Sequence, residues 1–198
     1  VLGVLCVLAV GFSLYRRSQK PSFQPPSANT RRITLLDAVQ NNDVTALESV
    51  AHWQSNEDSL VIVTVGSFNG NTAVLKAVLD HNTHIMPPML SGALVNAGTF
   101  GYLDMAQRIL KYPMPTKSKE VGLAWASQNG HTQVAQEFLN ANTDSNATQT
   151  LSGDTSKEIT PLMRAAGHGN SEVVALLLAH HANPHLKSTE GKTALDYA

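Results

Sequence analysis

The chain has 198 residues, of which 42% are hydrophobic, so it can bury a substantial core in one or two domains. Its 14 basic and 15 acidic side chains give a formal net charge of -1, which argues against the broad basic surface of a nucleic-acid-binding protein. The single cysteine, Cys6, excludes an internal disulfide and a thiolate metal cluster. Because the chain begins at Val1 and stops at Ala198 within a predicted helix, we expect it to be a fragment of a longer protein.

Residues 1–17 are predicted to form a hydrophobic helix. Val1–Tyr15 carries no charge and is followed at once by Arg16 and Arg17. About 20 apolar residues cross a bilayer, so we interpret this segment as the truncated end of a single-pass membrane anchor. The basic residues place the following chain on the cytoplasmic side. A secretory signal peptide, with Ala9-Val10-Gly11 as a weak cleavage site, is the alternative and would make the protein secreted or periplasmic. A buried core segment is a third interpretation.

Residues 18–32 are predicted to be a flexible linker. Ser18–Thr30 contains three prolines among polar residues and no apolar period. Such a composition favours an extended tether over a packed element.

From Ile33 onward the sequence predicts repeated pairs of short helices, and the clearest copy is Thr160–Pro184. Thr160 can cap the first helix, with Pro161 at its first position. Gly169 can adopt the positive φ that ends this helix and reverses the chain. The small pair Ala165-Ala166 allows close helix packing. A stripe at helical spacing is predicted to pack against neighbouring copies; it contains Val173, Val174, Leu177 and Leu178.

The copies recur with a regular spacing. Thr193 starts a further copy, and its position number minus that of Thr160 is 33. Weaker copies align on their turns between the two helices, and the position numbers of successive turns differ by 28, 31, 29 and 39; these turns lie at Asn42, Gly70, Gly101, Gly130 and Gly169.

This pattern resembles the ankyrin repeat, whose period is about 33 residues. The resemblance implies an all-α fold, an ankyrin-repeat solenoid of stacked helix-turn-helix units over residues 33–198, with about five repeats and the start of a sixth. The second to fourth copies lack the Thr-Pro start and are short, so we expect trimmed connections. The last full interval exceeds the period by 6 (39 minus 33), and its polar segment Asn142–Lys157 predicts a mobile loop.

No sequence motif indicates catalysis. The chain contains no phosphate-binding loop, dinucleotide fingerprint, zinc-protease motif or nucleophile elbow. His180, His181 and His185 crowd one helix end, but no cysteine or nearby carboxylate completes a metal site. We therefore predict a protein that is not an enzyme, without catalytic residues, cofactor, metal or small-molecule substrate.

The resemblance instead implies a protein partner, which ankyrin repeats bind with their finger tips and the exposed face of their first helices. Phe68 and Phe100 stand where ordinary copies have polar residues, so exposed rings here would be candidate hot spots. The alternative is that each ring fills a gap between repeats. The predicted partner-binding residues are Phe68, Asn69, Thr99, Phe100, Gln128, Asn129 and His168.

The favoured function is a protein-protein interaction scaffold tethered to a membrane through the N-terminal segment, with the repeats facing the cytoplasm. One alternative is a secreted ankyrin protein that acts on external or host proteins. Another is the substrate-recruiting arm of an enzyme whose catalytic domain lies outside this sequence.

Overall fold

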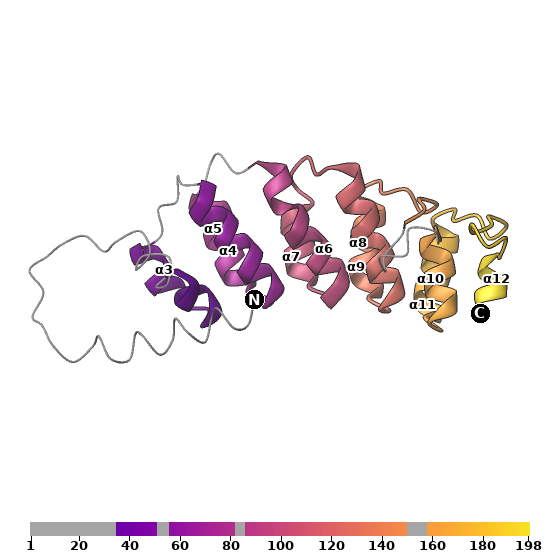
Figure 1. The fold of residues 1–198 in the computed structure, drawn as a ribbon, viewed down its shortest axis with the longest axis horizontal. Helices are drawn as coiled ribbons and strands as arrows, with labels where there is room; N and C mark the ends of the chain where they lie inside the picture. Colours follow the sequence, from indigo (N-terminus) through magenta and orange to yellow (C-terminus); the bar gives the residue numbers. More distant parts are fainter. Residues whose placement is uncertain (1–34, 51–55, 82–85, 150–157) are drawn as a thin grey trace, which may run out of the picture. The chain divides into compact units, whose positions relative to one another are not determined.

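The computed structural model describes residues 35–50, 56–81, 86–149 and 158–198 (Figure 1). The predicted anchor (1–17) and linker (18–32) lie outside these residues. Within the described ranges, no helix combines the length and the apolar character needed to cross a membrane. Residues Arg32–Ala198 form one compact unit.

The described residues form successive pairs of antiparallel helices, as expected for the all-α solenoid. The described residues contain no strand, and Gln149 and Ile159 form an isolated antiparallel β-bridge. A short helix, η1 (Pro87–Leu90), precedes the third pair, and α12 (Ala194–Tyr197) follows the fifth. The pairs are residues 35–40 with α3 (Val44–Val50), α4 (Asn56–Phe68) with α5 (Thr72–His81), α6 (Ser91–Phe100) with α7 (Leu103–Ile109), α8 (Thr116–Gln128) with α9 (Thr132–Asn140), and α10 (Pro161–Gly167) with α11 (Ser171–Ala179).

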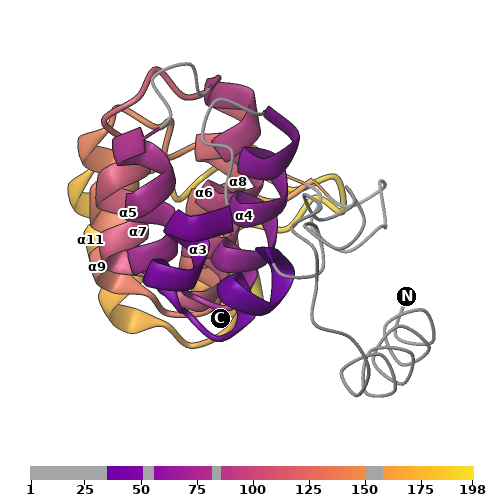
Figure 2. The same ribbon diagram turned by 90° about the vertical axis from the view of Figure 1, so that its left-hand side faces the viewer.

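The helices form two layers. First helices contact first helices, from α4 through α6, α8 and α10 to α12, and second helices contact second helices from α3 through α5, α7 and α9 to α11. Figure 2, which looks along the row, shows these layers on opposite sides. Each pair therefore buries its apolar faces against its neighbours, as repeat architectures do.

The predicted turns have the backbone conformation that the sequence requires. A left-handed φ occurs at every aligned turn position: 53° at Asn42, 70° at Gly70, 78° at Gly101, 74° at Gly130 and 70° at Gly169. Glycine and asparagine tolerate this conformation, which ends one helix and starts the reversal. The predicted turn conformation is thereby confirmed at each of these positions, although the intervals between the turns vary.

The start of α10 confirms the predicted cap. The Thr160 hydroxyl accepts a hydrogen bond from the Met163 amide at 3.3 Å, and Pro161 is the first helical residue. The apolar stripe of α11 is confirmed only in part: Val173 and Leu177 are fully buried, whereas Leu178 is 44% exposed. The spacing correctly predicts an apolar helix, but no described neighbour covers the side that carries Leu178.

The prediction of a mobile loop over Asn142–Lys157 is wrong for residues 142–149. Thr143 and Ser145 are buried, and their hydroxyls donate to the carbonyl oxygens of Phe138 (2.6 Å) and His180 (3.1 Å). The segment has few apolar side chains, but these hydroxyl groups bond to backbone carbonyls near helix ends. These hydrogen bonds hold residues 142–149 against the helices. Residues 150–157 lie outside the described part.

The surplus length of this connection can be located in the sequence by comparing two backbone pairs. Gln149 and Ile159 exchange backbone hydrogen bonds of 3.1 and 3.4 Å, and the corresponding bond in the next connection joins the Ser188 amide to the Lys192 carbonyl at 2.8 Å. The position numbers differ by 10 in the first pair (159 minus 149) and by 4 in the second (192 minus 188). The first interval is longer by the same surplus of 6, so the insertion lies between Gln149 and Ile159.

Helices α6 and α8 approach each other at the level of their backbones. A Cβ atom on Gly98 would lie 2.2 Å from the Gly122 carbonyl oxygen, and one on Gly122 would lie 2.3 Å from the Phe138 ring. Real Cβ atoms essentially never come this close to other atoms, so both positions require glycine. The absent side chain of Gly98 therefore allows α6 to touch α8, and the absent side chain of Gly122 makes room for the Phe138 ring of α9.

Candidate partner-binding surface

The predicted binding residues lie at the C-terminal ends of the first helices. We call the two residues before each turn the turn ridge; they are Gln40-Asn41, Phe68-Asn69, Thr99-Phe100, Gln128-Asn129 and Gly167-His168. Thr99 and Gln128 are partly buried, and the other members are exposed. Because neighbouring first helices pack side by side, the ridge runs from repeat to repeat.

Phe68 and Phe100 form an exposed aromatic pair. Phe68 is 65% exposed and Phe100 is 43% exposed. Their ring centroids lie 5.7 Å apart at an interplanar angle of 83°, an edge-to-face contact between adjacent repeats. The alternative in which both rings fill gaps between repeats is therefore wrong, whereas their role in binding a partner stays a prediction.

Tyr102 extends this pair, and the sequence reasoning missed it. Its ring centroid lies 5.6 Å from that of Phe100, and the ring also covers Gly70, where an added Cβ would lie 2.7 Å from it. Tyr102 directly follows a turn glycine, a position at which other copies have the polar residues Asn71, His131 and Asn170. An aromatic residue in that place was the sequence feature that could have revealed its role.

Those three equivalent residues tie each turn to the preceding one. The Asn71 carboxamide donates to the Val39 carbonyl, and that of Asn170 donates to the Ser127 and Gln128 carbonyls at 2.9 and 2.7 Å. Nε2 of His131 lies 3.2 Å from the Thr99 carbonyl and so acts as the donor. Tyr102 replaces this hydrogen bond by ring packing. The turn ridge is consequently anchored at every described boundary between full copies.

Most of the predicted binding residues are themselves held in place. Asn129 donates to the Thr99 carbonyl at 2.8 Å, and the Thr99 hydroxyl donates to the Val95 carbonyl at 2.9 Å. His168 bonds through Nδ1 to the Arg164 carbonyl at 3.0 Å. The side chain of Asn69 has no hydrogen-bond partner within the described residues, so its amide remains available to a ligand.

Arg164 is a buried cation that sequence reasoning also missed. It is 4% exposed, and its Nη1 and Nη2 donate to Gln128 Oε1 (3.1 Å) and the Gln149 carbonyl (2.6 Å). Burial lowers the pKa of Arg164 to about 10, so the guanidinium still carries its charge at neutral pH. Its Nε is buried without a partner. Arg164 lies five positions before its turn glycine (169 minus 164). Other copies have the uncharged residues Val65, Asn96 and Trp125 at this position. The single basic residue among them was the sequence feature that could have revealed this site.

Arg164 orients the side chain of Gln128 and binds the backbone carbonyl of Gln149. Because Arg164 occupies Gln128 Oε1, the amide nitrogen of Gln128 is left free to donate. The amide of Gln149 donates to Glu120 Oε2 at 3.0 Å. Arg164 therefore links α8, α10 and the connection between them.

The histidines near the end of α11 form no metal site within the described residues, where no group of three or more potential ligands gathers. Nε2 of His180 lies 3.0 Å from the Gln136 amide nitrogen and accepts its hydrogen bond. This contact joins α9 and α11, which gives His180 a packing role.

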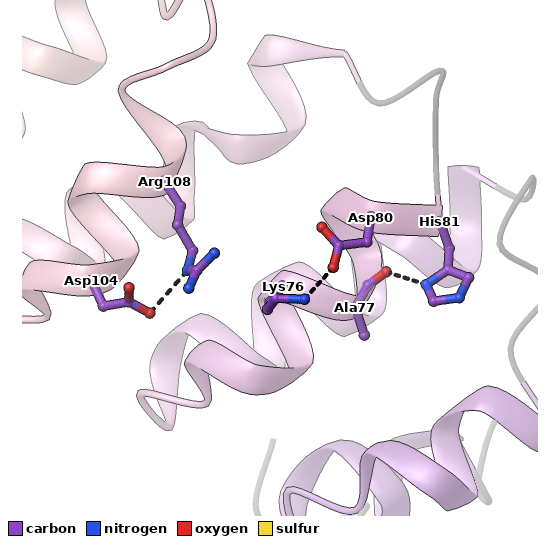
Figure 3. A network of polar contacts seen from close by, with 6 residues as sticks. All are labelled: Lys76, Ala77, Asp80, His81, Asp104 and Arg108. Atoms are coloured by element: carbon purple, nitrogen blue, oxygen red, sulfur yellow. Dashed lines mark hydrogen bonds and ion pairs between the residues drawn. The ribbon is translucent and has the colours of Figure 1, made fainter.

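Charged pairs lie instead on the second-helix layer. Figure 3 shows Lys76 with Asp80 on α5 and Arg108 with Asp104 on α7. The hydrogen bond from Lys76 lowers the pKa of Asp80, and the hydrogen bond to Asp104 raises the pKa of Arg108. Such exposed pairs add little stability, but they keep this layer hydrophilic.

Comparison with known proteins agrees with this architecture. Residues 123–198 match the family model described as ankyrin repeats (3 copies). "Putative ankyrin repeat protein YahD" of Escherichia coli (strain K12) is 38% identical over 88 residues, which cover 42% of this chain and 41% of that protein.

Two further relatives are much longer. "Ankyrin repeat, SAM and basic leucine zipper domain-containing protein 1" of Atelerix albiventris is 38% identical over 85 residues, or 42% of this chain and 16% of that protein. "Ankyrin repeat and KH domain-containing protein mask-1" of Caenorhabditis elegans is 26% identical over 126 residues, or 62% of this chain and 5% of that protein. The chain thus spans less than half the length of these curated relatives. Its residues 123–198 carry ankyrin repeats, and these indicate a protein-protein interaction module.

Proposed function

We propose that this chain is a non-enzymatic scaffold that binds a partner protein on its turn ridge, with Phe68 and Phe100 as the central contacts. The observation that carries the proposal is the exposed edge-to-face pair formed by these rings on adjacent repeats. Exposed aromatic side chains in contact offer a large apolar area with few rotatable bonds, which favours their use as binding hot spots.

Rigid support strengthens this assignment. Asn129 and His131 fix the Thr99 carbonyl beside Phe100, and Tyr102 packs against the Phe100 ring. A surface that is already ordered loses little conformational entropy when a partner binds. The turn ridge is therefore suited to binding without rearrangement of the helices.

The test is affinity capture of the partner from cells that express the protein, with wild type compared with Phe68→Ser and Phe100→Ser. We expect each substitution to reduce capture about tenfold, since a hot spot contributes more than about 1 kcal/mol and about 1.4 kcal/mol is a factor of ten. Thermal unfolding should change little because both rings are exposed. Leu178→Ser is the matched control, because Leu178 is also exposed (44%) but lies on α11. Equal capture by all four proteins would contradict the proposal.

Tethering to a membrane through residues 1–17, with the repeats on the cytoplasmic side, is part of this proposal. It rests on the uncharged run Val1–Tyr15 and the basic residues that follow it. Protease treatment of intact, membrane-enclosed cells expressing the full-length protein provides the test. Protected, membrane-associated repeats would support it, whereas release into the medium or digestion from outside would favour the secreted alternative.

A further inference from the structure

Asparagine followed by glycine occurs twice in the sequence, and both asparagines belong to the turn ridge. The two dipeptides are Asn69-Gly70 and Asn129-Gly130, at the turns of the second and fourth copies. Both asparagines are exposed, and both glycines are half-buried with a left-handed φ, 70° at Gly70 and 74° at Gly130. The same reactive dipeptide therefore stands in two matched places of the fold.

An asparagine side chain can react with the backbone of a glycine that follows it. The Gly70 nitrogen would attack Cγ of Asn69, so that a bond forms between these two atoms and the bond from Cγ to Nδ2 breaks. Nδ2 leaves as ammonia, which takes up the proton of the Gly70 amide. Water then opens the resulting succinimide ring to aspartate or isoaspartate, and no other reactant is consumed. Glycine favours the attack because it has no Cβ atom to obstruct the approach and a permissive backbone.

Asn129 is restrained against this reaction. Its Nδ2, the nitrogen that would leave, donates to the Thr99 carbonyl oxygen at 2.8 Å. The same oxygen lies 3.2 Å from Nε2 of His131, so the turn is held to the preceding copy on both sides of Gly130. Attack on Cγ requires the side chain to rotate, and the bond to Thr99 must break first. A hydrogen bond of ordinary strength lowers the fraction of free side chain about two- to tenfold.

Asn69 lacks this restraint. Its side chain has no hydrogen-bond partner among the described residues. The attacking nitrogen is also held weakly, because the Gly70 amide donates to the Ser67 carbonyl at 3.4 Å, beyond the usual range for such bonds. The equivalent bond from Gly169 to Ala166 measures 3.0 Å. Both atoms that must meet are therefore freer at the second turn.

We propose that Asn69 is a site of spontaneous modification, where the folded protein loses ammonia and acquires aspartate or isoaspartate, whereas Asn129 is protected. The ten residues of the turn ridge include no aspartate, glutamate, lysine or arginine, so the reaction places a charge on an uncharged ridge, next to Phe68. Isoaspartate also adds a methylene group to the backbone of a turn that the Tyr102 ring covers closely. The modification therefore changes the surface beside the aromatic pair without an enzyme.

The test is incubation of the 198-residue chain in mildly alkaline buffer, with mass spectrometry of proteolytic peptides to follow deamidation at both asparagines. We expect Asn69 to react about fivefold faster than Asn129 in the folded protein. In concentrated urea the two rates should become similar, because the contact of Asn129 with Thr99 is lost.

Two matched variants assign the change in charge. Asn69→Gln should remove most of the acidic shift that the folded protein develops in isoelectric focusing, since the longer side chain closes its larger ring slowly. Asn129→Gln should leave that shift nearly unchanged.

Equal rates at the two asparagines of the folded protein, faster reaction at Asn129, or no reaction at Asn69 would overturn the proposal. A ratio of rates that stays the same in urea would overturn it too, because the flanking residues and not the hydrogen bond would then set the difference. Isoaspartate among the products at Asn69 is expected from the succinimide. Aspartate alone would indicate direct hydrolysis and contradict the proposed route.

Discussion

Residues 35–122 and residues 123–198 build the same pairs of helices but join them differently. The ankyrin family model matches the second region. In the first, residues 110–115 suffice to connect α7 to α8, and α6 touches α8 through Gly98 and Gly122. In the second, longer connections carry backbone pairs at Gln149–Ile159 and Ser188–Lys192.

The two regions share the left-handed turn residues and the buried apolar face of the helices. These features therefore suffice to specify the helical pair, whereas the backbone pairs at Gln149–Ile159 and Ser188–Lys192 belong to connections of the second region. The first region substitutes close backbone contact and ring packing by Tyr102. The exposed pair of Phe68 and Phe100 lies in this first region.

The largest expected effect tests the apolar face that both regions share. Leu177→Ala removes a fully buried side chain of α11 and should lower the free energy of unfolding by about 3 kcal/mol, because it leaves a cavity. Leu178→Ala, one position along the same helix, should cost about 1 kcal/mol or less, since Leu178 is 44% exposed. Chemical denaturation measures both. Similar losses for the two variants would show that Leu178 is covered in solution.

A second substitution addresses close contact in the first region. Gly98→Ala would place a Cβ atom 2.2 Å from the Gly122 carbonyl oxygen, which forces α6 and α8 apart. We expect a loss of about 2 kcal/mol in the free energy of unfolding. Gly92→Ala is the matched control on α6, where nothing lies within 4 Å of an added Cβ. It should stabilise by about 0.5–1 kcal/mol through helix propensity. Tolerance of alanine at Gly98 would disprove the backbone contact.

Local features could be predicted from the sequence, and features that depend on other repeats could not. The turn at Gly169 and the cap by Thr160 follow from the residues themselves. The spacing shows that Leu177 and Leu178 are apolar helix positions, but which one is covered depends on neighbouring helices. The polar segment 142–149 is ordered because its hydroxyls reach helix ends elsewhere in the stack.

In the candidate site, too, local features could be predicted from the sequence, whereas contacts with other repeats could not. Exposure at the turn ridge could be predicted from the position of Phe68 and Phe100 before the turns, within a fold that resembles a known repeat. The contacts of Tyr102 and Arg164 could not, because they come from other repeats, at Gly70 and Gln128, or from the inserted connection at Gln149. Pattern alone does not indicate such distant partners.

A third prediction concerns the polar joint of the second region. Arg164→Met removes a buried charge with an unpartnered Nε while keeping the volume, so it should raise the free energy of unfolding by about 1 kcal/mol. It should also loosen the connection, because the Gln149 carbonyl loses the 2.6 Å bond from Nη2. Faster hydrogen exchange at the Gln149 amide would report that change. A large loss of stability would instead show that the guanidinium is essential to the joint.

The smallest expected effect distinguishes two helix starts within the second region. At α12, Asp196 Oδ2 accepts bonds of 2.7 Å from both the amide and the hydroxyl of Thr193, and these bonds hold the pKa of Asp196 below its ordinary value of 3.8. A carboxyl group whose pKa is lowered on folding stabilises the fold above its unfolded pKa, and this contribution disappears as the pH falls through the folded value. The α12 cap should therefore open in acid, which nuclear magnetic resonance of the Thr193 amide can follow.

At α10, the Thr160 amide bonds to the thioether of Met163, which does not titrate, so that cap should persist over the same range. Asp196→Asn should remove the pH dependence at Thr193 alone, and an unchanged titration in this variant would show that another group controls the cap.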